Sequence, residues 1–179
     1  MGNNMKRKLS KFLLLLLLFD CFLIGCTRFF TPPTAEEADA FLKSNWHDID
    51  TAVNYLKAID TDIAFVVGTT VKYEFKDHEI VQEDVKTCFQ HLWNAGCELI
   101  SYDVGDNTIS FEIWNTTFGN VGCGIACTIN GKGFPKAEMQ TECKLISYGW
   151  YYFVADYEEY RKSPSKYDEM WDAENIQTP

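Results

Sequence analysis

The chain of 179 residues is short of positive charge: it carries 16 lysines and arginines against 26 aspartates and glutamates, and only three histidines. A protein that binds nucleic acid needs a basic surface to neutralise the phosphates, so this imbalance argues against a nucleic-acid partner. It also argues against a polybasic contact with anionic lipid headgroups. An acidic surface keeps a protein soluble, and it could also receive a basic partner.

The sequence also lacks the spacings that metal and phosphate sites require. Zinc is held by three or four ligands that usually come in closely spaced pairs, and Cys88 with His91 has no second pair to match it. The acidic stretches over 47–50 and 60–62 fall short of the extended oxygen-rich loop of a calcium-binding EF-hand. The glycines form no phosphate-binding loop of the expected form. We therefore expect no metal and no cofactor.

A nucleophile with an oriented base is likewise missing from the sequence pattern. Cys88 or Cys97 together with His78 or His91 could supply a thiol and a base, but no local motif supports either pair. The segment 122–124, Gly-Cys-Gly, lies in an alternating strand rather than in the strand-to-helix turn of a nucleophile elbow. We expect no catalytic residues and a protein that is not an enzyme, with a hydrolase of envelope material as an alternative.

What the sequence does contain is an N-terminal segment with the order of an export signal. Four basic residues lie between positions 6 and 11, the stretch 12–18 is wholly apolar, and the segment closes on Leu23-Ile24-Gly25-Cys26. This ending resembles the lipobox of bacterial lipoproteins, in which a Leu stands three residues before an invariant Cys. The resemblance covers only the first 26 residues. It implies that Cys26 receives a diacylglyceryl group and becomes the first residue after cleavage.

An uncleaved membrane helix is the alternative interpretation of this segment. The stretch from Phe12 to Cys26 has 15 residues, whereas a bilayer core needs roughly 20. Asp20 interrupts the apolar run at a cost of about 2.5–3.5 kcal/mol, but ten Leu, Phe and Ile residues at about 0.3–0.6 kcal/mol each outweigh it. Under either interpretation, the basic start predicts a domain that faces outside the cytoplasm, held at the cell membrane or envelope.

The part that follows Gly25 fits one acidic domain. Without residues 1–25 the chain has 154 residues, with twelve lysines and arginines against 25 aspartates and glutamates, and a net charge near −13. This length suits one domain with a sizeable core. Of the 27 aromatic residues in the full chain, 24 follow Gly25 and supply large side chains for this core. We expect a signal over 1–25, the lipidated Cys26 with its tether over 26–33, a domain over 34–162, and a loose acidic tail over 163–179.

The spacing of apolar residues predicts two main helices followed by strands. Thr34 to Glu37 matches a capping box, and a helix then extends to about Lys57; a second is expected over 82–95. One or two strands separate these helices, and four strands in hairpin-like succession follow the second helix. The order predicts an α+β fold: an antiparallel sheet of about five or six strands with the two helices packed on one face.

The cysteines after Cys26 are odd in number, which leaves at least one of them outside any disulfide within a monomer. They are Cys88, Cys97, Cys123, Cys127 and Cys143. A loop between two strands could bring Cys143 opposite Cys123 or Cys127, so a cross-strand disulfide is one hypothesis. The other, which we prefer, is that all five are small buried hydrophobic side chains.

Aromatic residues on the final strands give a candidate ligand face. Trp114 lies opposite the apolar side of its strand, and the last strand is aromatic on both sides. If helices cover one face of the sheet, Trp114 with Trp150 or Tyr151 could lie on the other face and bind a sugar or a peptide. Packing under a second layer, such as the C-terminal tail, is the simpler interpretation.

These observations favour a membrane-anchored lipoprotein whose domain is a binding or interaction module at the cell envelope. An immunity or inhibitor lipoprotein that neutralises a basic toxin or enzyme is the first alternative. Small size, excess negative charge and membrane attachment motivate it.

Overall fold

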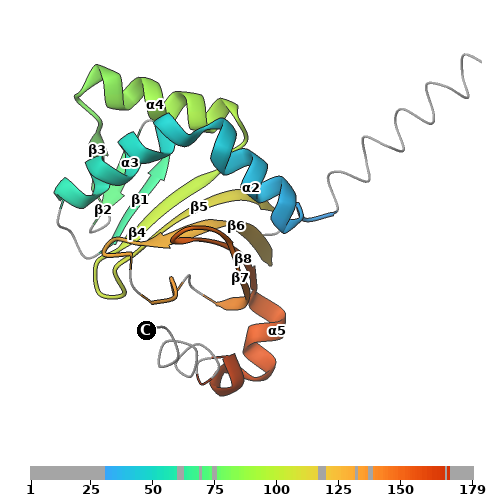
Figure 1. Ribbon diagram of the computed structural model, residues 1–179. Helices are drawn as coiled ribbons and strands as arrows, with labels where there is room; N and C mark the ends of the chain where they lie inside the picture. The colour runs from blue at the N-terminus through green and yellow to red at the C-terminus, as the bar shows by residue number, and fades with distance from the viewer. Residues whose placement is uncertain are drawn as a thin grey trace, which may run out of the picture. The chain divides into compact units, whose positions relative to one another are not determined.

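The computed structural model describes residues 31–59, 63–68, 70–73, 76–116, 120–131, 133–136, 139–167 and 169 (Figure 1). The chain divides into two units, Met1–Pro32 and Pro33–Pro179. The signal segment and Cys26 lie outside the described residues, so the fold given below is that of the second unit.

Two consecutive helices begin this unit, and their sequence explains where each starts. In the capping box of α2 (Ala35–Ser44), the Thr34 amide donates to Glu37 Oε2 at 2.9 Å and the Glu37 amide donates back to Thr34 Oγ1 at 3.3 Å. The predicted single helix divides at Asn45, whose side-chain amide donates to the Phe41 carbonyl oxygen and ends α2. The chain continues as α3 (Trp46–Ile59).

The sheet is antiparallel between all neighbouring strands. Its strand order is β3-β2-β1-β4-β5-β6-β8-β7. The bounds are β1 Ile63–Val67, β2 Thr70–Tyr73, β3 Lys76–Glu79, β4 Leu99–Asp103, β5 Thr108–Asn115, β6 Val121–Thr128, β7 Gln140–Ser147 and β8 Trp150–Asp156. Two further helices are α4 (Glu83–Asn94) and α5 (Tyr157–Lys162).

The predicted α+β class is confirmed, with an antiparallel sheet and helices. The sheet has eight strands, more than the five or six expected, because the segment between α3 and α4 forms three strands. The sequence predicts one or two strands between these helices, whereas the backbone over 76–79 also pairs with β2, as β3. Charged residues at the edge of a sheet do not alternate with apolar ones, so their pattern resembles that of a turn.

The core lies between one face of the sheet and the helices α2, α3 and α4, which Figure 1 shows together on one side of the sheet. The register places Ile109, Cys127 and Trp150 side by side across β5, β6 and β8, and it does the same for a second row two residues further on. Helix residues that pack onto these rows include Leu42, Ile49, Leu56, Phe89 and Leu92.

The opposite face of the sheet is lined by small and polar side chains. Ser101, Ser110, Ala126 and Tyr151 lie in one row across four strands. The loop after β6 covers part of this face, because the ring of Phe134 contacts that of Tyr151 at 4.7 Å between centroids. The expected loop between β6 and β7 therefore serves as a partial second layer.

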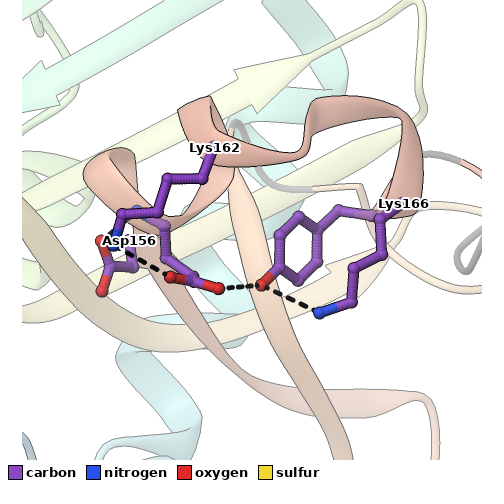
Figure 2. A network of polar contacts seen from close by, with 5 residues as sticks. Asp156, Lys162 and Lys166 are labelled. Carbon is purple, nitrogen blue, oxygen red and sulfur yellow. Dashed lines mark hydrogen bonds and ion pairs between the residues drawn. The ribbon is translucent and has the colours of Figure 1, made fainter.

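The C-terminal helix α5 is followed by a docked segment rather than by a loose one. The ring of Tyr167 is buried and stacks on that of Tyr160, and its hydroxyl donates to Glu159 Oε1 at 3.0 Å. Figure 2 shows Asp156 and Lys162 at one end of this polar network and Lys166 at the other. The predicted tail over 163–179 is thus docked at Tyr167 through an aromatic side chain, and positions 168 and 170–179 of that tail lie outside the described residues.

Candidate functional site

The three residues of the candidate ligand face do not lie together. Trp150 is buried in the core beneath the helices, and Trp114 packs against that same core. Tyr151 lies on the opposite face of β8 and is buried beneath Phe134. The set thus divides between the two faces of the sheet, and two of its members are core residues.

A β-bulge is the reason that Trp114 differs from its expected side. The β5–β6 register passes from the pair Glu112–Gly124 to the pair Trp114–Cys123, so β5 has one extra residue between them. An extra residue reverses which face every later side chain occupies. Strict alternation from Phe111 would have placed Trp114 opposite the core, and the bulge turns it onto the core.

The structure instead exposes two other aromatic side chains, one that contacts Trp150 and one in the turn just before it. Trp46, the first residue of α3, has 51% of its surface exposed, and its ring meets that of Trp150 edge-on at 6.2 Å. Tyr148 lies in the turn between β7 and β8 and is 97% exposed. We call Trp46, Tyr148 and Trp150 the aromatic corner. Sequence reasoning missed Trp46 because the break at Asn45 interrupts the single helix to which it had been assigned.

The five cysteines that the structure describes form no disulfide, so the hypothesis of a bond from Cys143 to Cys123 or Cys127 is wrong. Strand β8 lies between β7 and β6, which separates these backbones by roughly 9–10 Å, beyond the 7 Å limit for disulfide geometry. The register also places Cys143 beside Phe153, on the opposite face from Cys123 and Cys127.

Burial keeps most of the thiols protonated. It raises the pKa of Cys97, Cys123 and Cys127 to about 12 in each case. The thiolate is the reactive form of cysteine, so these three groups are poor nucleophiles at neutral pH. The preferred interpretation of the cysteines as small hydrophobic residues agrees with four of the five being buried; Cys143 is half-buried.

A polar cluster between α3 and α4 brings together a thiol, an imidazole and a carboxylate. His91 Nδ1 lies 3.5 Å from Asp48 Oδ2, and the Cys88 thiol is hydrogen-bonded to the same carboxylate. Burial first, and then this hydrogen bond, raise the pKa of Cys88. Asp48 thus stands between the thiol and the imidazole, whereas a cysteine nucleophile needs the imidazole next to the sulfur.

Metal binding finds no support in this cluster. Within the part of the chain that the structure describes, no three His, Cys, Asp or Glu side chains are arranged so that they could hold a metal ion. His78, the other imidazole considered as a base, belongs to β3, and its side chain lies outside the description.

The opposite face of the sheet holds a partly buried carboxylate, Glu112. Burial raises its pKa, and a hydrogen bond with Asn115 opposes that effect. The carboxyl group lies over Gly122, where an added Cβ would approach Glu112 Cδ to 3.1 Å. Next to this group in the sheet, the hydroxyls of Ser101 and Ser110 are 2.5 Å apart. Composition alone gave no signal for Glu112, because its burial depends on the missing side chain of a glycine on the next strand.

The start of the second unit is fixed to the sheet. The Tyr152 hydroxyl donates to the Pro33 carbonyl oxygen at 2.9 Å, and Lys144 on β7 lies 4.0 Å from Glu36 in the first turn of α2. Burial raises the pKa of Tyr152, which keeps its phenol a hydrogen-bond donor. The chain therefore enters the domain at one defined place, above β8 and β7.

Comparison with known proteins found no matching family model, no matching curated protein and no matching solved structure. Among the described residues, no helix combines the length and the apolar character that crossing a membrane requires.

Proposed function

We propose that this chain is a lipid-anchored binding module that faces outside the cytoplasm and is acylated at Cys26. The observation that carries the proposal is the sequence Leu23-Ile24-Gly25-Cys26 at the end of a basic and then apolar segment. A diacylglyceryl group supplies two acyl chains, and two chains hold a protein to a bilayer where one binds reversibly.

The beginning of the domain is consistent with such an anchor. The capping box at Thr34 starts a helix eight residues after Cys26, and Tyr152 holds the Pro33 carbonyl oxygen to the sheet. A short connection that ends on a fixed attachment keeps the domain close to its lipid. Anything the domain binds must therefore be reachable at the membrane surface.

The chemistry of the thiols supports binding rather than catalysis as the role of the domain. Cys97 is buried, with a pKa of about 12, and Cys88 contacts a carboxylate that favours its neutral form. Neither sulfur has the activation that a nucleophile needs. We propose a non-enzymatic interaction module as the function that these residues fit best.

The anchor is tested by comparing Cys26→Ala with Cys21→Ala in a bacterial host fed a fatty acid that carries a detectable tag. Cys21 is the matched control because it lies in the same segment but outside the lipobox. We expect Cys26→Ala to remove the tag and leave a full-length precursor, while Cys21→Ala is tagged and shortened normally. Tagging and shortening that survive in Cys26→Ala would overturn the lipoprotein proposal.

A role as an immunity or inhibitor lipoprotein is the second candidate, and the charge of the helical layer favours it. Helices α2, α3 and α4 contain seven aspartates and glutamates against three lysines. This excess would attract a basic protein, and salt would weaken the attraction. Affinity purification of the tagged, acylated protein should then recover a basic partner at low salt and release it at high salt. Recovery that is independent of salt would contradict this second candidate.

A further inference from the structure

We propose that the aromatic corner is a membrane-contact surface: Trp46 and Tyr148 lie in the interface of the zwitterionic bilayer that holds the lipid anchor. The inference rests on the proposed acylation of Cys26 and goes beyond it. It states which part of the domain touches the lipid and which kind of lipid that part fits.

The exposure of these two side chains is what requires an explanation. Trp46 shows 51% of its surface and Tyr148 shows 97%, although both are large and apolar over most of their area. They belong to the same corner of the fold. The ring of Trp46 contacts that of Trp150, and Tyr148 precedes Trp150 by two residues, in the two-residue turn that the pair Ser147–Trp150 closes.

The length of the connecting chain makes the bilayer the fitting occupant of this corner. Cys26 precedes Pro33 by seven residues, which span at most about 25 Å when fully extended. Helix α2, with ten residues, covers about 15 Å between Pro33 and the corner. The tether is therefore long enough for the lipid to insert while the corner rests on the same bilayer.

Both ends of α2 lie over the same strand, which gives the corner a fixed position relative to the tether. Pro33 is hydrogen-bonded to Tyr152, and Trp46 just beyond the helix contacts Trp150, two residues earlier on β8. Residues two apart on a strand are about 7 Å apart and share a face. Pro33, where the chain enters the domain, and Trp46 therefore lie over the same face of β8.

The side chains at the corner match the chemistry of a membrane interface. Tryptophan and tyrosine are enriched where lipid headgroups meet the hydrocarbon, because each combines an apolar ring with a polar tip. Lys43, in the last turn of α2, has 70% of its side chain exposed but pairs with Asp39. Asp50 lies one turn after Trp46 on α3 and is exposed. Paired and opposite charges around the rings fit a zwitterionic headgroup layer better than an anionic one.

The experiment uses the acylated and processed protein in phosphatidylcholine vesicles. The acyl chains of these vesicles carry bromine or do not, and bromine quenches tryptophan fluorescence at contact. We compare the wild type with Trp46→Phe and with the matched control Trp93→Phe. Trp93 lies on α4 and is 41% exposed. We expect bromine-dependent quenching to fall by at least about threefold in Trp46→Phe and to stay unchanged in Trp93→Phe.

Tyr148→Ala gives a second variant that should fold normally, since its side chain makes almost no buried surface. We expect it to reduce the bromine-dependent quenching of Trp46, because it removes half of the aromatic contact. Equal quenching in Trp46→Phe and the wild type would overturn the proposal and leave the corner for a soluble partner. A fall of the bromine-dependent quenching in Trp93→Phe would also overturn the proposal.

The two proposals fail in distinguishable ways. Sedimentation with vesicles reports the anchor, whereas bromine quenching reports the contact surface. If acylated protein sediments with the vesicles but Trp46 is not quenched, the anchor proposal stands and the proposed membrane-contact surface is rejected. Protein that is never acylated rejects the anchor, and the membrane-contact surface is rejected with it.

Discussion

The Tyr152 hydroxyl donates a hydrogen bond to the Pro33 carbonyl oxygen at 2.9 Å, and these two residues are separated by 119 positions in the chain. One contact thus joins the first residue of the folded unit to the strand at the centre of its aromatic core. It determines where the chain enters the domain.

Removing this contact should loosen the start of the domain. In Tyr152→Phe the ring stays and only the hydroxyl is lost, so we expect a loss of about 0.5–1.5 kcal/mol, the usual net value of one hydrogen bond. For a domain of this size that corresponds to a fall in Tm of roughly 2–4 °C. Thermal unfolding followed by circular dichroism measures it. Tyr148→Phe is the control, because its fully exposed hydroxyl should leave the Tm unchanged.

The thiols should differ sharply in their reactivity. We expect a thiol-alkylating reagent at neutral pH to label Cys143 first, because it is the half-buried one, while the four buried cysteines react only after unfolding. Intact-mass measurement counts the labels, and Cys143→Ser should remove the fast one. Treatment with a reductant should not change the mass of this domain, since it contains no disulfide. Rapid labelling of Cys97 or Cys123 in the folded protein would contradict this assignment.

The same thiols predict how stability depends on alkaline pH. The pKa of Cys123 and Cys127 rises from 9.0 to about 12 on folding, so the folded state keeps protons that the unfolded state releases. Their stabilising contribution is complete below pH 9 and is lost as the pH rises toward 12. Urea unfolding between these limits should show a falling free energy of unfolding. Cys127→Ala should flatten that slope, whereas Cys143→Ala should leave it unchanged.

Glu112 predicts a pH dependence in the acidic range. Burial raises its pKa above 4.5 in the folded state, so its ionisation opposes folding at higher pH. The stability that the protonated Glu112 carboxyl contributes is fully present below the pKa of Glu112 in the unfolded state. It is lost as the pH rises through the pKa of Glu112 in the folded state. We therefore expect Glu112→Gln to be more stable than the wild type at pH 7, with the difference vanishing at about pH 4. Glu98→Gln, which removes a charge that contributes to raising the pKa of Glu112, should give a smaller gain in stability at pH 7.

Local patterns allowed the helices and the fold class to be predicted, because both depend on neighbours in the sequence. The capping box at Thr34 joins neighbours within one element, and the structure contains it. The strand β3 was harder to predict, since this edge strand carries charged residues that do not follow the alternation of a half-buried strand.

The candidate site could not be predicted because it depends on register. The side chain of Trp114 is turned onto the core by one extra residue in β5, and Cys143 is kept from Cys123 by the insertion of β8 between their strands. Neither the extra residue in β5 nor the position of β8 can be recognised from the amino-acid types of these residues. The exposed position of Trp46 also follows from the helix break at Asn45, where the sequence predicts one continuous helix.

Gly124 tests the close pairing of β5 with β6 beside the bulge, where the structure departs from the alternation that the sequence predicts. A Cβ on Gly124 would lie 1.9 Å from the Phe111 carbonyl oxygen, a backbone atom that cannot move aside without breaking the β5–β6 pairing. We expect Gly124→Ala to lower the free energy of unfolding by about 3 kcal/mol, at the upper end of the cost of overpacking.

Gly122→Ala is the matched control, two residues away on β6. Its Cβ would meet the carboxyl of Glu112 at 3.1 Å, the far end of a flexible side chain, so a loss of less than about 1 kcal/mol is expected. Urea unfolding of both variants measures the difference, and equal losses would mean that β5 and β6 do not approach one another at this bulge.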